Sequence, residues 1–150
     1  MEQAPSIRTA VPADYDAIAP VVDRWWGRPI LDSLPRLFLD LFYRSSLVID
    51  GAGGPDAFLI GIFSPSDAER AYIHFVGVAP NARRRGYGRL LYEHFFRLAK
   101  ADGRSRVSAI TAPVNLRSAE FHRTLGFMVS GPVRDHNGPG HDMLVFDRML

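Results

Sequence analysis

The sequence contains no cysteine and has only one lysine among its 18 basic residues. Without cysteine, the chain cannot form a disulfide, a thiolate metal site or a catalytic thiol. The longest apolar stretch, Ala57–Phe63, is far shorter than the ~20 residues that a membrane helix needs. The N-terminal segment MEQAPSIRTA has no apolar stretch behind basic residues. We therefore expect no secretory signal and a cytoplasmic protein that does not enter a membrane.

The length and composition are typical of one ordinary globular domain. The chain has 150 residues, of which 47% are hydrophobic and 23% are charged. No internal repeat or low-complexity tract divides it, and the most linker-like segment, Gly51–Pro55, is as short as a hairpin loop. We therefore predict a single domain over residues 1–150.

The net charge of +2 is unevenly distributed along the chain. Residues 1–82 carry six arginines against ten acidic residues, whereas residues 83–150 carry twelve basic residues against six acidic ones. This asymmetry predicts that the C-terminal half binds an anion.

Hydrophobic periodicity and turn residues predict a mixed α/β fold. A short strand and two helices should come first, followed by three strands that read as a meander. A strand, helix and strand from Tyr72 to Thr111 then form a parallel crossover unit. We expect a break at Trp25–Pro29, a second helix from Ser33, a helix over Asn115–Leu125 and a final strand pair, Phe127–Val133 and Met143–Met149.

The segment Val76–Gly88 lies between a predicted strand and the first turn of a predicted helix. Free backbone N–H groups and the helix dipole favour an anion at such a position. Two glycines, Gly86 and Gly88, allow close approach, and three consecutive arginines precede them. The segment matches neither GxxxxGK[ST] nor GxGxxG, so ATP and NAD are disfavoured.

The six residues Arg83–Gly88 match the pattern Arg/Gln-x-x-Gly-x-Gly/Ala, and with this motif the sequence resembles the GCN5-related N-acetyltransferases (GNAT). A second signature follows downstream, with Asn115, Ser118, His122 and the pair Gly126-Phe127. The resemblance implies a GNAT-like fold in which seven strands form a mixed sheet, splayed between the fourth and fifth strands. Acetyl-CoA is then the implied cosubstrate.

The resemblance also implies the residues that bind the cofactor. Val76 and Val78 would hold the pantetheine arm through backbone groups, and Gly77 would mark a bulge or a close backbone approach. Packing of Gly77 beneath a helix is the alternative. The remaining candidates contact the pyrophosphate or the arm, and they are Arg83, Arg84, Arg85, Gly86, Tyr87, Gly88, Arg89, Asn115 and Ser118.

Two histidines are candidates for proton transfer. Asn115, Ser118 and His122 should share one helix face, and His122 occupies a position where the family usually has a tyrosine that protonates the departing thiolate. A histidine could donate that proton, or it could be a hydrogen-bonded structural residue. His74 is the candidate base, because a protonated amine cannot attack a thioester; a hydrogen-bonded core histidine is the alternative.

Other aromatic and histidine residues have two interpretations each. Trp25 and Trp26, together with Tyr72, are candidates for binding the acceptor, although the tryptophans could instead fill the open end of the domain. His136 and His141 are five residues apart without an acidic ligand cluster, so we predict a solvated loop and no metal site.

We therefore predict an N-acetyltransferase that moves the acetyl group of acetyl-CoA directly to a primary amine on a small molecule or peptide. Family members often dimerise, so the resemblance allows a homodimer. A non-catalytic acyl-CoA sensor on the same fold is the main alternative. Nucleic-acid binding through Arg83–Arg89, Arg104 and Arg106 is disfavoured by the modest net charge, and we expect no such partner.

Overall fold

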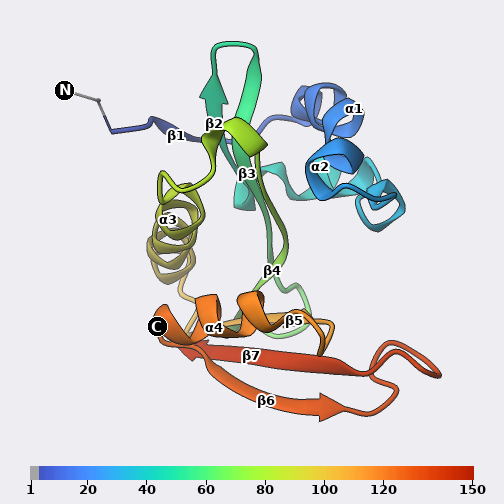
Figure 1. Cartoon of the computed structure of the whole chain (residues 1–150). Helices are drawn as coiled ribbons and strands as arrows, with labels where there is room; N and C mark the ends of the chain where they lie inside the picture. The colour runs from blue at the N-terminus through green and yellow to red at the C-terminus, as the bar shows by residue number, and fades with distance from the viewer. Residues whose placement is uncertain (1–3) are drawn as a thin grey trace. The chain divides into compact units, whose positions relative to one another are not determined.

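The computed structural model describes residues 4–150. Its elements follow the predicted order, with four short 3-10 helices added (Figure 1). The strands are β1 Ile7–Thr9, β2 Leu47–Gly51, β3 Gly54–Phe63, β4 Arg70–Val78, β5 Arg106–Thr111, β6 Met128–Val133 and β7 Met143–Met149. The helices are α1 Tyr15–Trp26, α2 Leu37–Phe42, α3 Tyr87–Ala101 and α4 Leu116–Thr124, and the 3-10 turns are η1 Pro12–Asp14, η2 Leu31–Ser33, η3 Tyr43–Ser45 and η4 Pro80–Ala82.

The seven strands form one mixed sheet in the order β1-β2-β3-β4-β5-β7-β6. The meander is antiparallel at β1–β2 and β2–β3, and the predicted crossover is confirmed because β4 and β5 pair in parallel. That parallel register joins Arg70–Tyr72 to Arg106–Ser108, at the N-terminal ends of the two strands. The mixed α/β fold is the predicted class.

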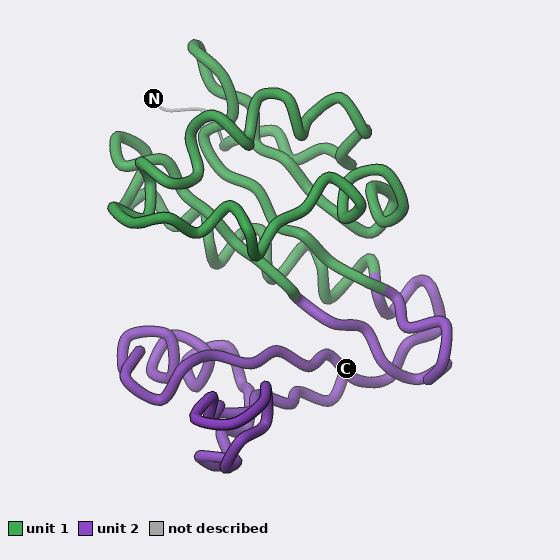
Figure 2. The backbone as a smooth tube through the Cα atoms, turned by 90° about the vertical axis from the view of Figure 1, so that its right-hand side faces the viewer, with its two compact units in different colours: residues 1–62, 74–98 green, residues 63–73, 99–150 purple. Residues whose placement is uncertain are grey.

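The chain divides into two compact units, each built from two stretches of sequence (Figure 2). Unit 1 comprises residues 1–62 and 74–98, and unit 2 comprises residues 63–73 and 99–150. The division passes through β4 and α3 and separates the last residue of β3, so each of these elements contributes to both units.

In unit 1, α1 and α2 lie on one side of the strands and α3 lies on the other (Figure 1). The core on the α1 side includes Ile18, Val22 and Leu39, which are fully buried with Phe58 and Ile60 of β3. On the other side, Phe95 of α3 lies so close to Gly61 that a Cβ there would overlap its ring. β3 is therefore buried on both faces, as its run of apolar residues requires.

Two predicted boundaries are wrong. Trp25 and Trp26 do not break the first helix but complete α1, which ends at Gly27 because that residue adopts φ 71°, a left-handed conformation that glycine tolerates. The second helix begins at Leu37 rather than Ser33, because Leu34 leaves η2 with ψ 67° and cannot continue a helix.

Candidate functional site

The connection between β4 and α3 has the backbone geometry of an anion-binding turn. Arg84 and Gly86 have positive φ angles of 67° and 77°. Turns of this type aim successive N–H groups at one point and form concave anion sites. The first bond of α3 runs from the Leu90 amide to the Gly86 carbonyl at 3.1 Å, so the amides of residues 87–89 stay outside the helical ladder.

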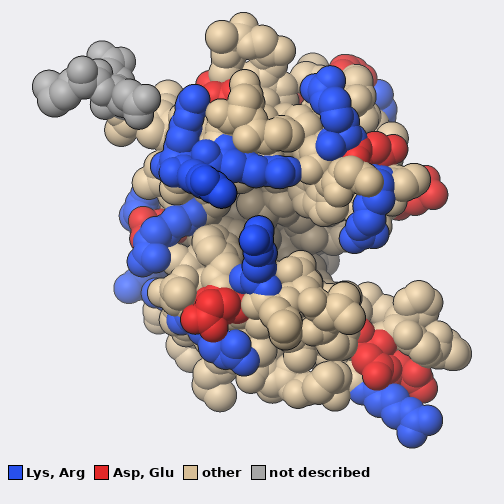
Figure 3. Space-filling view, viewed as in Figure 1, with Lys and Arg blue, Asp and Glu red and all other residues tan. Residues whose placement is uncertain are grey.

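Basic side chains gather over this turn (Figure 3). Arg84, Arg85 and Arg89 are exposed, and Arg89 forms a 3.0 Å ion pair with Glu93 one helical turn later. The turn thus combines main-chain donors, the positive end of a helix and guanidinium groups, which together suit a diphosphate.

Arg83, the first residue of the motif, has a different orientation. Its guanidinium donates a 2.6 Å hydrogen bond to the backbone carbonyl of Trp25, in the last turn of α1. A cation at a helix C-terminus also interacts favourably with the helix dipole. Arg83 therefore ties the turn to α1.

The two faces of β4 differ in burial. Ala71, Ile73 and Gly77 are buried, whereas Tyr72, His74, Val76 and Val78 are partly exposed. Buried and partly exposed side chains thus alternate at these positions, as expected for a β-strand. Gly77 lies against aromatic side chains, because a Cβ added there would be 2.7 Å from the Phe58 ring and 3.0 Å from that of Trp26. This contact favours the packing interpretation of Gly77, although the packing is beneath rings rather than a helix.

His74 is held by groups from η2 and α2. Its Nε2 lies 2.7 Å from the Ser33 carbonyl, and its ring stacks on Phe38 with centroids 4.1 Å apart. Because a carbonyl only accepts, Nε2 must carry the proton, and the lone pair of the neutral ring lies on Nδ1. Burial lowers the pKa of His74, against a smaller opposite effect of the Ser33 hydrogen bond. The ring is thus kept neutral and able to accept a proton.

The candidate acceptor residues differ in accessibility. Trp25 is 5% exposed and packs on Phe58 at a centroid distance of 5.9 Å, which favours its packing interpretation. Trp26 is half-buried and lies 4.7 Å from Phe75 of β4. Tyr72 is partly exposed, and burial raises the pKa of its hydroxyl, which therefore stays protonated at neutral pH.

In unit 2, the predicted face of α4 forms around its N-terminus. Asn115 is the N-cap of α4, with Oδ1 accepting a 3.2 Å hydrogen bond from the Ser118 amide and Nδ2 donating to Thr111 Oγ1 at 3.3 Å. Ser118 in turn contacts His122: its Oγ lies 3.3 Å from Nδ1, and its carbonyl lies 2.7 Å from the same nitrogen. The three residues thus lie on one face, as predicted.

His122 is 5% exposed and is surrounded by aromatic rings. It stacks on Phe146 of β7 at a centroid distance of 3.9 Å and meets Phe127 edge-on at 5.0 Å. The Ser118 carbonyl requires a proton on Nδ1, so the neutral ring carries its lone pair on Nε2. Burial lowers the pKa of His122, outweighing the opposite effect of the Ser118 hydrogen bond. This environment favours the neutral form of the ring, in which Nε2 carries no proton that it could donate.

Two of the arginines considered for nucleic-acid binding, Arg104 and Arg106, are engaged within unit 2. Arg104 Nη1 donates to the carbonyls of Ser64 and Asp67 at 2.8 and 3.1 Å, and its Nε donates to Asp102 at 2.9 Å. Arg106 lies 3.6 Å from Asp147. These contacts give both side chains a structural use.

Sequence reasoning did not find the groups that hold these candidate residues. The carbonyls of Trp25, Ser33 and Ser118 are backbone atoms, which leave no pattern in a sequence. Phe38 and Phe146 had signals only as apolar residues of a helix and a strand.

Among residues 4–150, no cluster of three or more histidine, aspartate or glutamate side chains could hold a metal ion. Within the same residues, no helix is both long enough and apolar enough to cross a membrane.

The family model described as the acetyltransferase (GNAT) family matches residues 22–127. The chain belongs to this family. A search of curated proteins found no match. Among solved structures, Ard1 from Thermoplasma volcanium has a TM-score of 0.82 at 20% identity, covering 99% of this chain and 99% of its own.

Two further structural neighbours were crystallised with acetyl-CoA or coenzyme A. Phosphinothricin acetyltransferase from Sinorhizobium meliloti, in complex with acetyl-CoA, has a TM-score of 0.75 at 19% identity over 99% of this chain and 89% of that one. N-acetylglutamate synthase from Neisseria gonorrhoeae, complexed with coenzyme A and N-acetyl-glutamate, has a TM-score of 0.75 at 22% identity. The match covers 100% of this chain and 36% of the synthase.

Proposed function

We propose that this GNAT protein transfers the acetyl group of acetyl-CoA directly to a primary amine. The observation that carries the proposal is the turn at Arg84–Gly86, whose two positive φ angles and following helix start coincide with the phosphate motif of the family. The phosphinothricin acetyltransferase and N-acetylglutamate synthase structures, which hold acetyl-CoA and CoA, support the choice of cofactor.

In this proposal the turn holds the pyrophosphate through main-chain amides from Arg84 to Arg89. The guanidinium groups of Arg84 and Arg85 would balance the charge without a metal ion. Backbone groups of Val76 and Val78 take the pantetheine arm along β4. This places the thioester beside the partly exposed side chain of His74, on the same strand.

His74 would accept the proton of the attacking amine. An alkylammonium of pKa near 10.4 has no lone pair for attack, so a neutral base must remove one proton, directly or through a water molecule. His74 fits this task because Ser33 fixes the proton on Nε2 and leaves Nδ1 as the acceptor. The amine nitrogen then bonds to the acetyl carbon, a backbone N–H near Val76 stabilises the oxyanion, and the carbon–sulfur bond breaks.

The departing thiolate must gain one proton, and His122 is the proposed donor. That role requires protonation on Nε2, because Nδ1–H is directed at the Ser118 carbonyl. The aromatic rings around His122 disfavour its protonated form. The geometry therefore supports a purely structural role for His122 as strongly as it supports proton donation. Substitution of this residue decides between the two roles.

The proposal is tested by measuring CoA thiol release from acetyl-CoA with a panel of amines, including amino acids, aromatic amines, polyamines and short peptides. We expect saturable turnover with at least one of them. His74→Gln should reduce kcat by roughly 100-fold, the lower end of what general base catalysis supplies. His136→Gln, in the exposed β6–β7 hairpin, is the matched control and should retain full activity. Saturable CoA binding with no thiol release for any amine would instead support the acyl-CoA sensor.

A further inference from the structure

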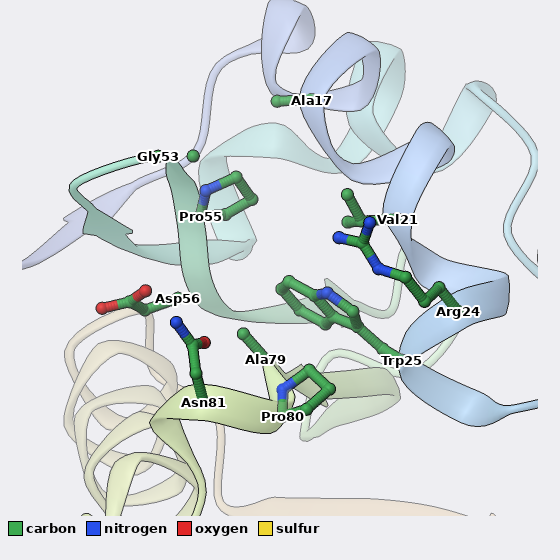
Figure 4. A pocket seen from close by; sticks show the side chains of 11 residues that line it. Ala17, Val21, Arg24, Trp25, Gly53, Pro55, Asp56, Ala79, Pro80 and Asn81 are labelled. Atoms are coloured by element: carbon green, nitrogen blue, oxygen red, sulfur yellow. The ribbon is translucent and has the colours of Figure 1, made fainter.

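A cavity of about 470 Å³ lies within unit 1, separate from the partly exposed face of β4. Its walls come from α1, from the β2–β3 turn and from η4 (Figure 4). Val21, Trp25, Pro55 and Pro80 form its apolar surfaces. A volume of this size is in the range of small-molecule sites.

The polar side chains along the cavity wall are those of Arg24, Asn81 and Asp56. The Arg24 guanidinium extends over the Trp25 ring toward the middle of the cavity, and the Asn81 amide lies at the opposite side (Figure 4). The Asp56 carboxylate points outward instead (Figure 4). It lies over Gly51, where an added Cβ would overlap it. The guanidinium is suited to an anion, and the Asn81 amide can donate to the same group or accept from it.

The side chains of Arg24 and Asn81 are both exposed. Among residues 4–150, the side chains of Arg24 and Asn81 make no hydrogen bond and no ion pair, in contrast to Arg83, which is bonded to the Trp25 carbonyl. Since the other lining side chains, apart from Asp56, are apolar and include an indole ring, an inorganic anion would leave most of this surface without contacts. The occupant should combine one anionic group with a flat apolar body.

We propose that this cavity binds a small aromatic carboxylate. We further propose that this binding is coupled to the conformation of the turn at Arg84–Gly86, which we call the phosphate turn. The coupling has two structural links. Trp25 forms a wall of the cavity and also supplies the carbonyl that holds Arg83. Pro80 and Asn81 form part of η4, which leads directly into Arg83–Gly86. An occupant that fixes η4 and the end of α1 stabilises the turn in its binding conformation and raises the affinity for CoA.

The first experiment measures binding of phenylacetate to the full chain by calorimetry, with phenylacetamide as the neutral match. We expect saturable, millimolar binding of the carboxylate, at least fivefold weaker binding of the amide, and a similar loss in Arg24→Gln. Arg28→Gln, an exposed arginine outside the cavity, is the matched control and should bind as the unaltered protein does. Equal binding of the two probes, or an unaltered Arg24→Gln variant, would overturn the site.

The second experiment measures the dissociation constant of CoA with and without saturating phenylacetate. We expect a decrease of roughly two- to fivefold that is absent in Arg24→Gln. An unchanged constant would overturn the coupling, and an increase would show that the probe competes at the phosphate turn. Neither measurement requires acetyl transfer, so failure here is distinguishable from failure of the proposed catalytic function.

Discussion

The Arg83 guanidinium donates a 2.6 Å hydrogen bond to the Trp25 carbonyl, which joins the phosphate turn to the end of α1. The two residues are 58 positions apart in the sequence. In this arrangement the leading arginine of the motif positions the turn, while Arg84 and Arg85 remain next to the expected phosphates. The motif therefore combines residues with two different physical tasks.

Replacing Arg83 with glutamine should weaken CoA binding by roughly fivefold. The reason is the loss of a charge-assisted hydrogen bond worth about 1 kcal/mol on a partly exposed side chain, which leaves the turn less ordered. Titration calorimetry with CoA measures the effect, and Arg97→Gln, an exposed arginine on α3, controls for the lost charge. Equal weakening in both variants would indicate a general electrostatic effect rather than positioning.

Replacing Gly86 with valine should weaken CoA binding by roughly 5- to 30-fold. Gly86 has φ 77° and open space around its Cβ position, so the penalty comes from the backbone conformation, roughly 1–2 kcal/mol for a residue with a side chain. Gly103→Val is matched, because Gly103 has φ 83° and similarly open space but lies beyond the end of α3. This control should lose comparable stability and keep its CoA affinity. Unaltered CoA affinity in the Gly86 variant would refute the phosphate turn.

Replacing His122 with phenylalanine should make stability less dependent on pH. Burial lowers the pKa of His122 in the folded state, whereas the unfolded chain has a value near 6.5. The unfolded state therefore binds more protons below about pH 6.5, and the free energy of unfolding falls as the pH decreases through that region. Denaturant unfolding at pH 7 and pH 5 should show a smaller difference in the variant than in the unaltered protein.

The same variant separates the two roles of His122. Phenylalanine can stack on Phe146 as the imidazole does, so a structural residue would be replaced with little loss of turnover. If His122 is instead the proton donor, phenylalanine cannot replace it, so kcat would fall while the dissociation constant of CoA stayed the same. A pH difference in stability as large as that of the unaltered protein would contradict the buried neutral ring.

Replacing Gly77 with alanine should destabilise the protein by about 1–3 kcal/mol. A Cβ at this position would meet Phe58 and Trp26 at 2.7 and 3.0 Å, so the aromatic packing must shift. Gly53→Ala is the control, because no atom lies within 4 Å of its Cβ position, and it should change the free energy of unfolding by less than about 0.5 kcal/mol. Chemical denaturation checks both variants, and equal stabilities would contradict the packing described for β4.

The sequence predicted the elements with strong periodicity and distinctive local chemistry. The predicted strand, helix and strand from Tyr72 to Thr111 correctly included α3. The turn at Arg83–Gly88 was recognisable because its glycines allow the backbone conformation and its arginines supply positive charge. Asn115 was correctly grouped with Ser118 and His122, since helical geometry fixes their common face.

The sequence was insufficient where tertiary contacts determine the end of a helix or the protonation state of a side chain. Trp25 and Trp26 looked like a break because Gly27 and Pro29 follow closely, but Phe58 and Phe75 provide rings for them to pack on, and the helix continues to Trp26. His74 could be assigned to a strand face but not to a protonation state. That state depends on the Ser33 carbonyl, an atom that every residue type possesses.

The division of β4 and α3 between the two units has a practical consequence for dissecting the protein. No single cut in the gene yields either unit free of the other, because each unit is interrupted by a stretch of sequence that belongs to its neighbour. Unit 1 in isolation would require residues 1–62 and 74–98 to be rejoined by a new connection. Fragment complementation between separately expressed halves is therefore better suited to this chain than simple truncation.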